Sequence, residues 1–242
     1  FVSLMAANNE TGALQPVAEA AGIVHEAGGV LHTDAVQMAG RLPVDLGALG
    51  ADLLTLSAHK VGGPKGVGAL ILAEGAGVRP LMTGGGQEGW RRPGTENVAG
   101  IVGFGVAAEC AGNEMSHMDK VARLRDALED GVRTVAPDAV VFAQSIPRLP
   151  NTSSIAVPGL KAETLVIGLD LAGVSISAGS ACSSGKVETS HVLAAMGAAP
   201  EVARAAIRVS LGIGNSDHDI QNFLVAFGDL VKRLRKDAKE AA

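Results

Sequence analysis

The chain has 242 residues, of which 47% are hydrophobic and 19% are charged, and its formal net charge at pH 7 is −5. This composition is typical of a globular protein with one large domain or two unequal ones. The negative charge argues against a nucleic-acid partner, because phosphate binding requires a basic surface. No apolar stretch is long and clean enough to span a bilayer, which argues against a membrane protein.

Two cysteines, Cys110 and Cys182, are too few for a disulfide framework and fit a reducing compartment. Cys110 lies among Ala and Val residues in a helical pattern, so we expect it to be a packing residue. The first residues, 1–6, have the pattern of a buried strand, with no initiator Met and no polar lead-in. We therefore expect the chain to begin in the middle of a fold.

In the first half of the chain, short apolar runs alternate with helical patterns. This alternation predicts an α/β layer structure with a mostly parallel sheet. We expect a helix over 16–25, with Ala20, Ile23 and Val24 on its buried face and the glycines at 28–29 ending it. Strands are predicted at 1–6, 30–34, 53–57 and 69–72.

In the second half, a glycine-rich loop at 83–95 precedes a helical pattern that runs from 96 to about 135. A long helix here is expected to join a partial large domain, residues 1–115, to the smaller C-terminal α+β domain, residues 116–242. Further strands are predicted at 140–143, 153–157, 174–177 and 206–211, and further helices at 163–171, 191–196, 201–205 and 217–236.

The stretch Ser57-Ala58-His59-Lys60 follows a short apolar run and precedes a glycine-rich turn. A lysine at the end of a buried strand is expected to be poorly solvated, which favours the nucleophilic amine that a Schiff base requires. On this stretch alone, a surface lysine in a hairpin is an equal alternative.

A carboxylate, Asp34, ends the predicted strand at 30–34. Such a residue often caps a turn. Together with Lys60, it is also the partner expected for pyridoxal phosphate, because an anion keeps the pyridine nitrogen of that cofactor protonated. Ser57, His59 and Thr95 are candidate phosphate donors, and the glycine backbone before Thr95 offers N–H groups to an anion.

Two further residues of the second half are candidates for chemistry. Cys182 lies in a loop of small residues, 177–185, where a thiol is accessible to a ligand and to another protein. Arg208 lies within an apolar strand, where its side chain must either extend to solvent or bind an anion such as a carboxylate. The histidines have no metal-ligand spacing, and we predict no metal site.

Taken together, these stretches resemble the cysteine desulfurases, which are class V, fold-type I pyridoxal-phosphate enzymes. The match extends over nearly the whole chain and follows the family's order. The matching segments are 8–12, 32–37, 57–60, 84–88, 92–97, 180–182 and 207–211.

The resemblance implies a cofactor role for five residues of the first half. Lys60 would bind pyridoxal phosphate covalently, Asp34 would pair with the ring nitrogen, and Gln37 would donate to the ring hydroxyl. Ser57 and His59 would hold the phosphate.

The resemblance also implies roles in substrate binding, assembly and catalysis. Asn9 would support cofactor and substrate, and Arg208 would bind the substrate carboxylate. Thr95 would reach the phosphate of the partner subunit in a homodimer. Cys182 would accept sulfur from L-cysteine as a persulfide, release alanine and pass the sulfur to an acceptor. The long serine-rich loop around Cys182 resembles the iron–sulfur-assembly group of the family.

Two departures from the family pattern qualify this prediction. About the first third of the family's chain is absent, including its phosphate loop and the histidine that stacks on the cofactor. His25 and His32 lie on the wrong elements to replace that histidine. Pro93 stands where relatives often have a small residue. Because the first third is absent, we expect the 242-residue chain alone to hold the cofactor poorly and to be inactive as a fragment.

The sequence thus predicts a cytoplasmic, homodimeric cysteine desulfurase that supplies sulfur to an iron–sulfur scaffold or another acceptor protein. A selenocysteine lyase or another class V enzyme is the nearest enzymatic alternative. A non-catalytic remnant that serves as a binding module is the alternative from another class.

Overall fold

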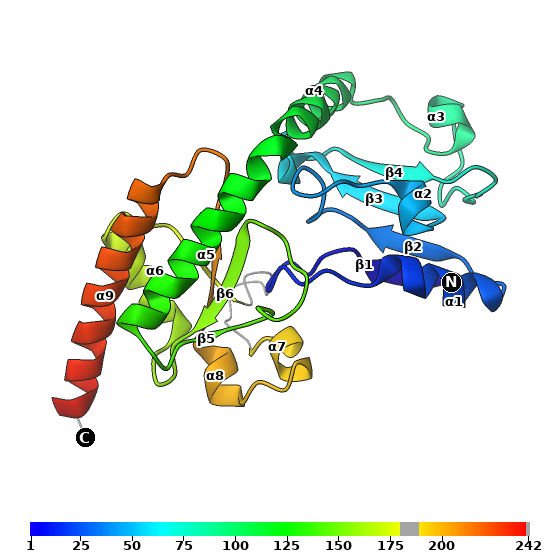
Figure 1. Ribbon diagram of the computed structural model, residues 1–242. Coiled ribbons are helices and arrows are strands. Elements are labelled where there is room, and N and C mark those ends of the chain that lie inside the picture. Colours follow the sequence, from blue (N-terminus) through cyan, green and yellow to red (C-terminus); the bar gives the residue numbers. More distant parts are fainter. Residues whose placement is uncertain (180–188, 241–242) are drawn as a thin grey trace. The chain divides into compact units, whose positions relative to one another are not determined.

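A computed structural model describes residues 1–179 and 189–240, and the side chains of all of these except 238 and 239. The chain divides into two compact units (Figure 1). Unit 1 comprises Phe1–Asn8 and Leu14–Ser116, and unit 2 comprises Asn9–Ala13 and His117–Ala242.

Unit 1 is an α/β layer built on a sheet with the order β1-β2-β3-β4. β1 pairs with β2 and β2 with β3 in parallel, whereas β4 is antiparallel to β3. The sheet is therefore mostly parallel, as predicted. Its strands are β1 (Val2–Met5), β2 (Leu31–Asp34), β3 (Leu53–Ser57) and β4 (Gly68–Leu72). Its helices are α1 (Val17–Glu26), α2 (Leu46–Leu49), η1 (Ala58–Lys60), α3 (Gln87–Trp90), α4 (Val98–Glu114) and η2 (Met115–His117), the last of which ends in unit 2.

The core of unit 1 lies between α1 and the sheet. Val17 and Ala21 are the buried residues of α1, with Val24 partly buried, because residues at i, i+4 and i+7 share one helix face. The expectation for Ile23 was wrong, since this side chain lies off that face and is 70% exposed. The expectation that residues 1–6 form a buried strand was also wrong for β1, which is an edge strand of the described sheet and is mostly exposed.

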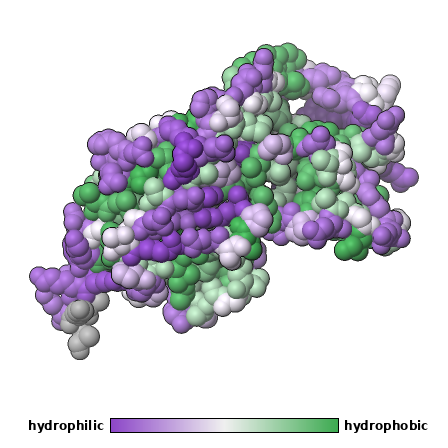
Figure 2. Space-filling view, viewed as in Figure 1, coloured by the Kyte–Doolittle hydropathy of each residue, from purple (hydrophilic) through white to green (hydrophobic). Residues whose placement is uncertain are grey.

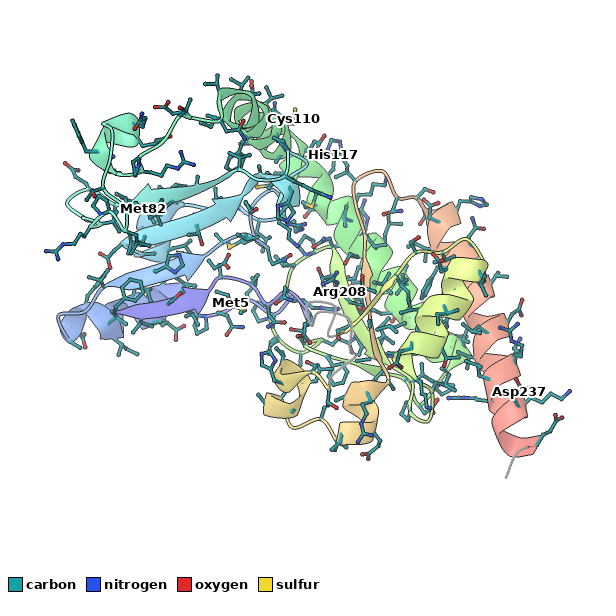
Figure 3. All side chains as sticks on the ribbon, turned by 180° about the vertical axis from the view of Figure 1, so that it is seen from behind. Met5, Met82, Cys110, His117, Arg208 and Asp237 are labelled. Carbon is teal, nitrogen blue, oxygen red and sulfur yellow. The ribbon has the colours of Figure 1, made fainter. Side chains whose placement is uncertain are left out.

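The predicted helix from 96 to about 135 is divided into α4, η2 and α5 (Met118–Val135). Small residues of α4, such as Gly100 and Ala107, are buried, whereas Val98, Val102 and Val106 are exposed, and Figure 2 shows hydrophobic surface over α4. Cys110 is exposed, so the expectation that it packs in a core was wrong (Figure 3). The close-packed face of α4 is formed by its small residues, and Cys110 lies off that face.

Unit 2 is an α+β arrangement with a sheet of order β5-β6-β8-β7 in which all described pairings are antiparallel. α5 and α9 pack side by side, and their apolar faces contribute to the main core (Figure 1). The opposite face of α5 is charged, in line with the hydrophilic surface over this helix in Figure 2. The strands are β5 (Val140–Val141), β6 (Thr152–Ala156), β7 (Ser177–Ala178) and β8 (Ala206–Ser210), and the remaining helices are α6 (Ala162–Leu171), α7 (His191–Ala195), α8 (Pro200–Arg204) and α9 (Asp217–Glu240).

Most elements of unit 2 lie within a few residues of their predicted bounds. The strand predicted at 174–177 is displaced, because only Ser177 and Ala178 pair with β8. β5 is shorter than predicted, since Ala143 adopts a left-handed backbone conformation that ends the pairing. Among the described helices, none is long and apolar enough to cross a membrane.

Candidate functional site

The carboxyl ends of three parallel strands in unit 1 form one edge of the sheet. The register aligns Met5 of β1 with Asp34 of β2, and Asp34 with Thr55 of β3. Open α/β sheets bind ligands at this edge, because the loops that leave the strands diverge there. The residues that follow β2 and β3 are the ones for which the sequence predicted chemistry.

Asp34 is exposed at the end of β2. Its Oδ1 accepts a hydrogen bond of 2.9 Å from the N–H of Val36, so the turn-capping role is present. A carboxylate has two acceptor oxygens, and this contact is compatible with a second interaction. Gln37 follows in the same turn and is partly buried.

The end of β3 turns into the short helix η1. Ser57 Oγ and His59 Nδ1 are 2.9 Å apart and form a hydrogen-bonded pair. Ala58 is fully buried, whereas His59 and Lys60 are exposed. The expected burial of Lys60 was therefore wrong. The tight turn after Ala58 carries the next two side chains beyond the packed end of the strand.

Thr95 lies on an exposed loop between α3 and α4. In this loop the Gln87 Oε1 accepts from the N–H of Gly94, and Arg92 donates to the carbonyls of Gly94 and Thr95. The loop is thus held by contacts within itself. Unit 1 thereby places Asp34 and Ser57 at the ends of the adjacent strands β2 and β3. Gln37, His59 and Lys60 follow these strands, and Thr95 lies on a separate loop.

In unit 2, Arg208 lies on β8 between β6 and β7 (Figure 3). Its Nη1 donates a hydrogen bond of 2.9 Å to the backbone oxygen of Asn9, which holds the guanidinium near the loop Asn9–Ala13. Its Nε is buried and has no partner among the described residues, and the same is true of Oγ of Ser154, its register partner on β6. An arginine with a buried, unpaired N–H is suited to a carboxylate ligand.

Cys182 lies outside the described residues, but contacts on both sides of that stretch are described. Before it, the N–H of Gly179 donates to the oxygen of Ala206 at 2.8 Å. After it, the buried Ser190 donates from Oγ to the buried carboxylate of Glu10 and accepts from the N–H of Leu193 at the start of α7.

Sequence reasoning missed Glu10 and Ser190. The helix-capping signal of a serine before the apolar run at 191–195 was available for Ser190. No local signal identifies its partner 180 residues away.

Among the described residues, no group of three or more His, Cys, Asp or Glu side chains is arranged to hold a metal ion. The groups described above are an amine, a carboxylate and a hydroxyl–imidazole pair in unit 1, and a guanidinium in unit 2.

Comparisons with known proteins agree with this fold. The chain is 44% identical to the cysteine desulfurase NifS of Azotobacter vinelandii over 97% of the chain and 58% of the relative. It is 46% identical to a cysteine desulfurase of Sinorhizobium fredii over 98% of the chain and 61% of the relative. The X-ray structure of a NifS-like protein from Rickettsia africae superposes with a TM-score of 0.87 at 38% identity, covering 96% of this chain and 61% of that one.

The chain thus spans about 60% of the length of these curated relatives. The family model described as "Aminotransferase class-V" matches residues 1–223. The solved structures that the chain resembles are NifS-like proteins of fold type I, which is the fold that the family resemblance implied. On this evidence the chain belongs to the class-V aminotransferase family.

Proposed function

We propose that this chain is part of a pyridoxal-phosphate-dependent L-cysteine desulfurase. The observation that carries the proposal is the order of groups at the carboxyl end of the unit 1 sheet. Asp34 ends β2, Ser57 ends the adjacent parallel strand β3, and His59 and Lys60 follow in η1. This donor set fits pyridoxal phosphate, which requires an amine, an anion and phosphate donors.

When bound, pyridoxal phosphate supplies an electron sink that weakens bonds at the carbon atoms of the bound amino acid. In this proposal Lys60 binds the cofactor and its freed amine then moves the Cα proton of the substrate. Asp34 holds the proton at the pyridine nitrogen. Gln37 donates to the ring hydroxyl. Ser57 and His59 bind the phosphate.

Substrate binding and sulfur transfer are assigned to other residues. Arg208 binds the carboxylate of L-cysteine, and Asn9 supports cofactor and substrate. The Cys182 thiolate attacks the substrate sulfur, so that an S–S bond forms while the bond between that sulfur and Cβ breaks. The products are a persulfide on Cys182 and, after protonation, alanine.

The assembly is proposed from the same resemblance. A homodimer would bring Thr95 to the phosphate held by the partner subunit, and the persulfide would pass to an iron–sulfur scaffold or another acceptor protein in the cytoplasm. Relatives named NifS and IscS support this assignment. A neighbouring structure, SspA, was determined in complex with cysteine, and is 30% identical with a TM-score of 0.68.

The cofactor assignment is tested by replacing Lys60 with alanine in the full-length protein. We expect the Lys60→Ala protein to lose the visible absorption of lysine-bound pyridoxal, because no other amine takes this position. Lys65 is exposed five residues further on, so Lys65→Ala is the matched control and should remain yellow. A yellow Lys60→Ala protein would contradict the assignment.

The sulfur-transfer step is tested by comparing Cys182→Ser with Cys110→Ser. Because only the first variant removes the proposed nucleophile, we expect it to release no sulfide from L-cysteine, while the second keeps the activity of the parent protein. Sulfide release by Cys182→Ser at the parent rate would show that no persulfide forms on this residue.

A further inference from the structure

One guanidinium in unit 1 contacts the turns that carry two of the proposed cofactor-binding residues. Arg41 Nη1 donates to the backbone oxygen of Gln37 at 3.0 Å and to that of Ala39 at 3.3 Å. Arg41 Nη2 reaches the backbone oxygen of Lys60 at 3.4 Å. The three carbonyls thus come from the turn after β2 and from η1 after β3.

The planar guanidinium is suited to this task. It presents five N–H donors in a fixed fork, so two nitrogens can serve two turns at once, whereas the ammonium of lysine is a single point charge. Arg41 is partly buried, which limits the competition from water for these carbonyls.

A second observation shows that the two turns approach closely. Gly40 has a left-handed backbone with φ of +72°, and a Cβ built on it would lie 3.1 Å from Cβ of Ala111 and 3.5 Å from Cγ1 of Val61. Val61 directly follows Lys60 in the chain. The absence of a side chain at position 40 therefore allows the turn after β2 to pack against η1.

We propose that Arg41 is a positioning residue that fixes the Lys60 turn relative to the Gln37 turn. This inference rests on the proposed function for its meaning in catalysis, since Lys60 and Gln37 are assigned to the cofactor. In these contacts Arg41 binds backbone oxygens of both turns, so it acts on where the two side chains begin.

The first test uses the full-length protein without cofactor and measures amide hydrogen exchange. In Arg41→Met we expect the rate of amide exchange to rise about tenfold or more in 35–42 and in 58–63, because each turn loses a hydrogen bond to a charged group. In 58–63 the reporting amides include those of Val61 and Gly63, which donate to the oxygen of Ala58. Faster exchange in 35–42 alone would overturn the proposal, since Arg41 would then stabilise only its own turn.

The matched control is Arg204→Met. Arg204 also donates to a backbone oxygen four residues earlier, that of Pro200, but lies on α8 of unit 2. We expect it to leave the exchange of 58–63 unchanged. If Arg41→Met does not fold, Arg41→Lys replaces it. Lysine has a single donor nitrogen and cannot occupy the positions of both Nη1 and Nη2. Exchange should therefore still rise in either 35–42 or 58–63, and full protection of both would overturn the proposal.

The second test measures binding of pyridoxal phosphate and its point of attachment. We expect Arg41→Met to weaken binding about tenfold, with Arg41→Lys between it and the parent protein. Borohydride reduction followed by peptide mapping should show less trapping on Lys60. A loss of stability alone would not change the affinity of the folded fraction, so unchanged affinity and trapping would overturn the proposal.

The two proposals fail in different ways. If Lys60→Ala stays yellow, the proposed function is wrong, and the exchange experiment on the cofactor-free protein still decides whether Arg41 couples the two turns. If Lys60→Ala loses its colour as expected, but Arg41→Met has the same amide exchange and the same cofactor affinity as Arg204→Met, the proposal that Arg41 couples the two turns is wrong.

Discussion

Arg208 combines a structural hydrogen bond with an N–H donor that has no partner among the described residues. Its Nη1 is bound to the backbone of Asn9, and its Nε is buried without a partner among the described residues. The hydrogen bond to Asn9 orients the guanidinium. The burial of the unpaired Nε–H costs free energy until an acceptor binds to it. A substrate carboxylate would supply that acceptor.

We expect Arg208→Gln to lower kcat/KM for L-cysteine about tenfold to a hundredfold, because a charged hydrogen bond is worth about 1.5–3 kcal/mol. The effect should fall mainly on KM, since the carboxylate is bound before and during the reaction. Steady-state kinetics of the full-length protein provide the measurement, with Arg204→Gln as control. A normal KM in Arg208→Gln would exclude a carboxylate role.

At the scale of elements, Asp52 connects α1, β2 and β3 at the edge of the sheet opposite the site. Its Oδ2 accepts a hydrogen bond of 2.7 Å from the N–H of Leu31 and lies 2.9 Å from Nε2 of His25. Two hydrogen bonds hold the pKa of Asp52 below its ordinary value of 3.8. The bond with His25 is the larger cause, and the bond from the N–H of Leu31 is the next.

A lowered pKa in the folded state means that the charged Asp52 stabilises the fold above pH 3.8 and that this contribution is lost as pH falls through the lower folded value. We therefore expect Asp52→Asn to be less stable than the parent at neutral pH and the difference to shrink in acid. Thermal unfolding across this pH range measures it. A difference in stability between Asp52→Asn and the parent that stays constant across this pH range would refute the assignment.

The boundaries of the elements follow from local patterns, whereas exposure depends on what covers them. The apolar run at 53–57 and the glycines at 28–29 were sufficient to predict β3 and the end of α1. The exposure of Ile23 and Cys110 was not predictable in this way, because several faces of each helix carry apolar residues and only the packing partner selects one.

At the scale of the whole molecule, the two units have separate cores. In unit 2, Glu129 is 1% exposed and binds both Nη atoms of Arg148 at 2.6 and 2.7 Å, with Ser153 Oγ donating at 2.7 Å. Ala13 of the loop Asn9–Ala13 pairs with Arg148 through a backbone bridge. The buried ion pair thus supports the loop that also binds Arg208. We propose that the units correspond to separate domains, 1–115 and 116–242, except that the loop Asn9–Ala13 belongs to unit 2 and Ser116 to unit 1.

We expect Glu129→Ala to cost about 3–5 kcal/mol, because it removes the close, buried partner of the Arg148 charge and leaves only the longer contact with Asp126 at 3.8 Å. Asp130→Ala, at the exposed neighbouring position, removes only a surface pair with Arg133 and should cost less than about 1 kcal/mol. Urea unfolding measures both. Hydrogen exchange should accelerate in unit 2 and not in unit 1; equal acceleration in both would show that they unfold as one domain.

The sequence by itself determined the ends of β2 and β3, the polar groups at these ends and the α/β class, because these depend on residue types and spacings within about ten positions. Tertiary structure alone decided that Lys60 is exposed, that Arg41 joins two turns and that Glu10 meets Ser190. Such contacts join residues from 19 to 180 positions apart. The physical reason is that a local pattern specifies which face of an element is apolar, whereas only the folded chain specifies which carbonyl or carboxylate a buried donor meets.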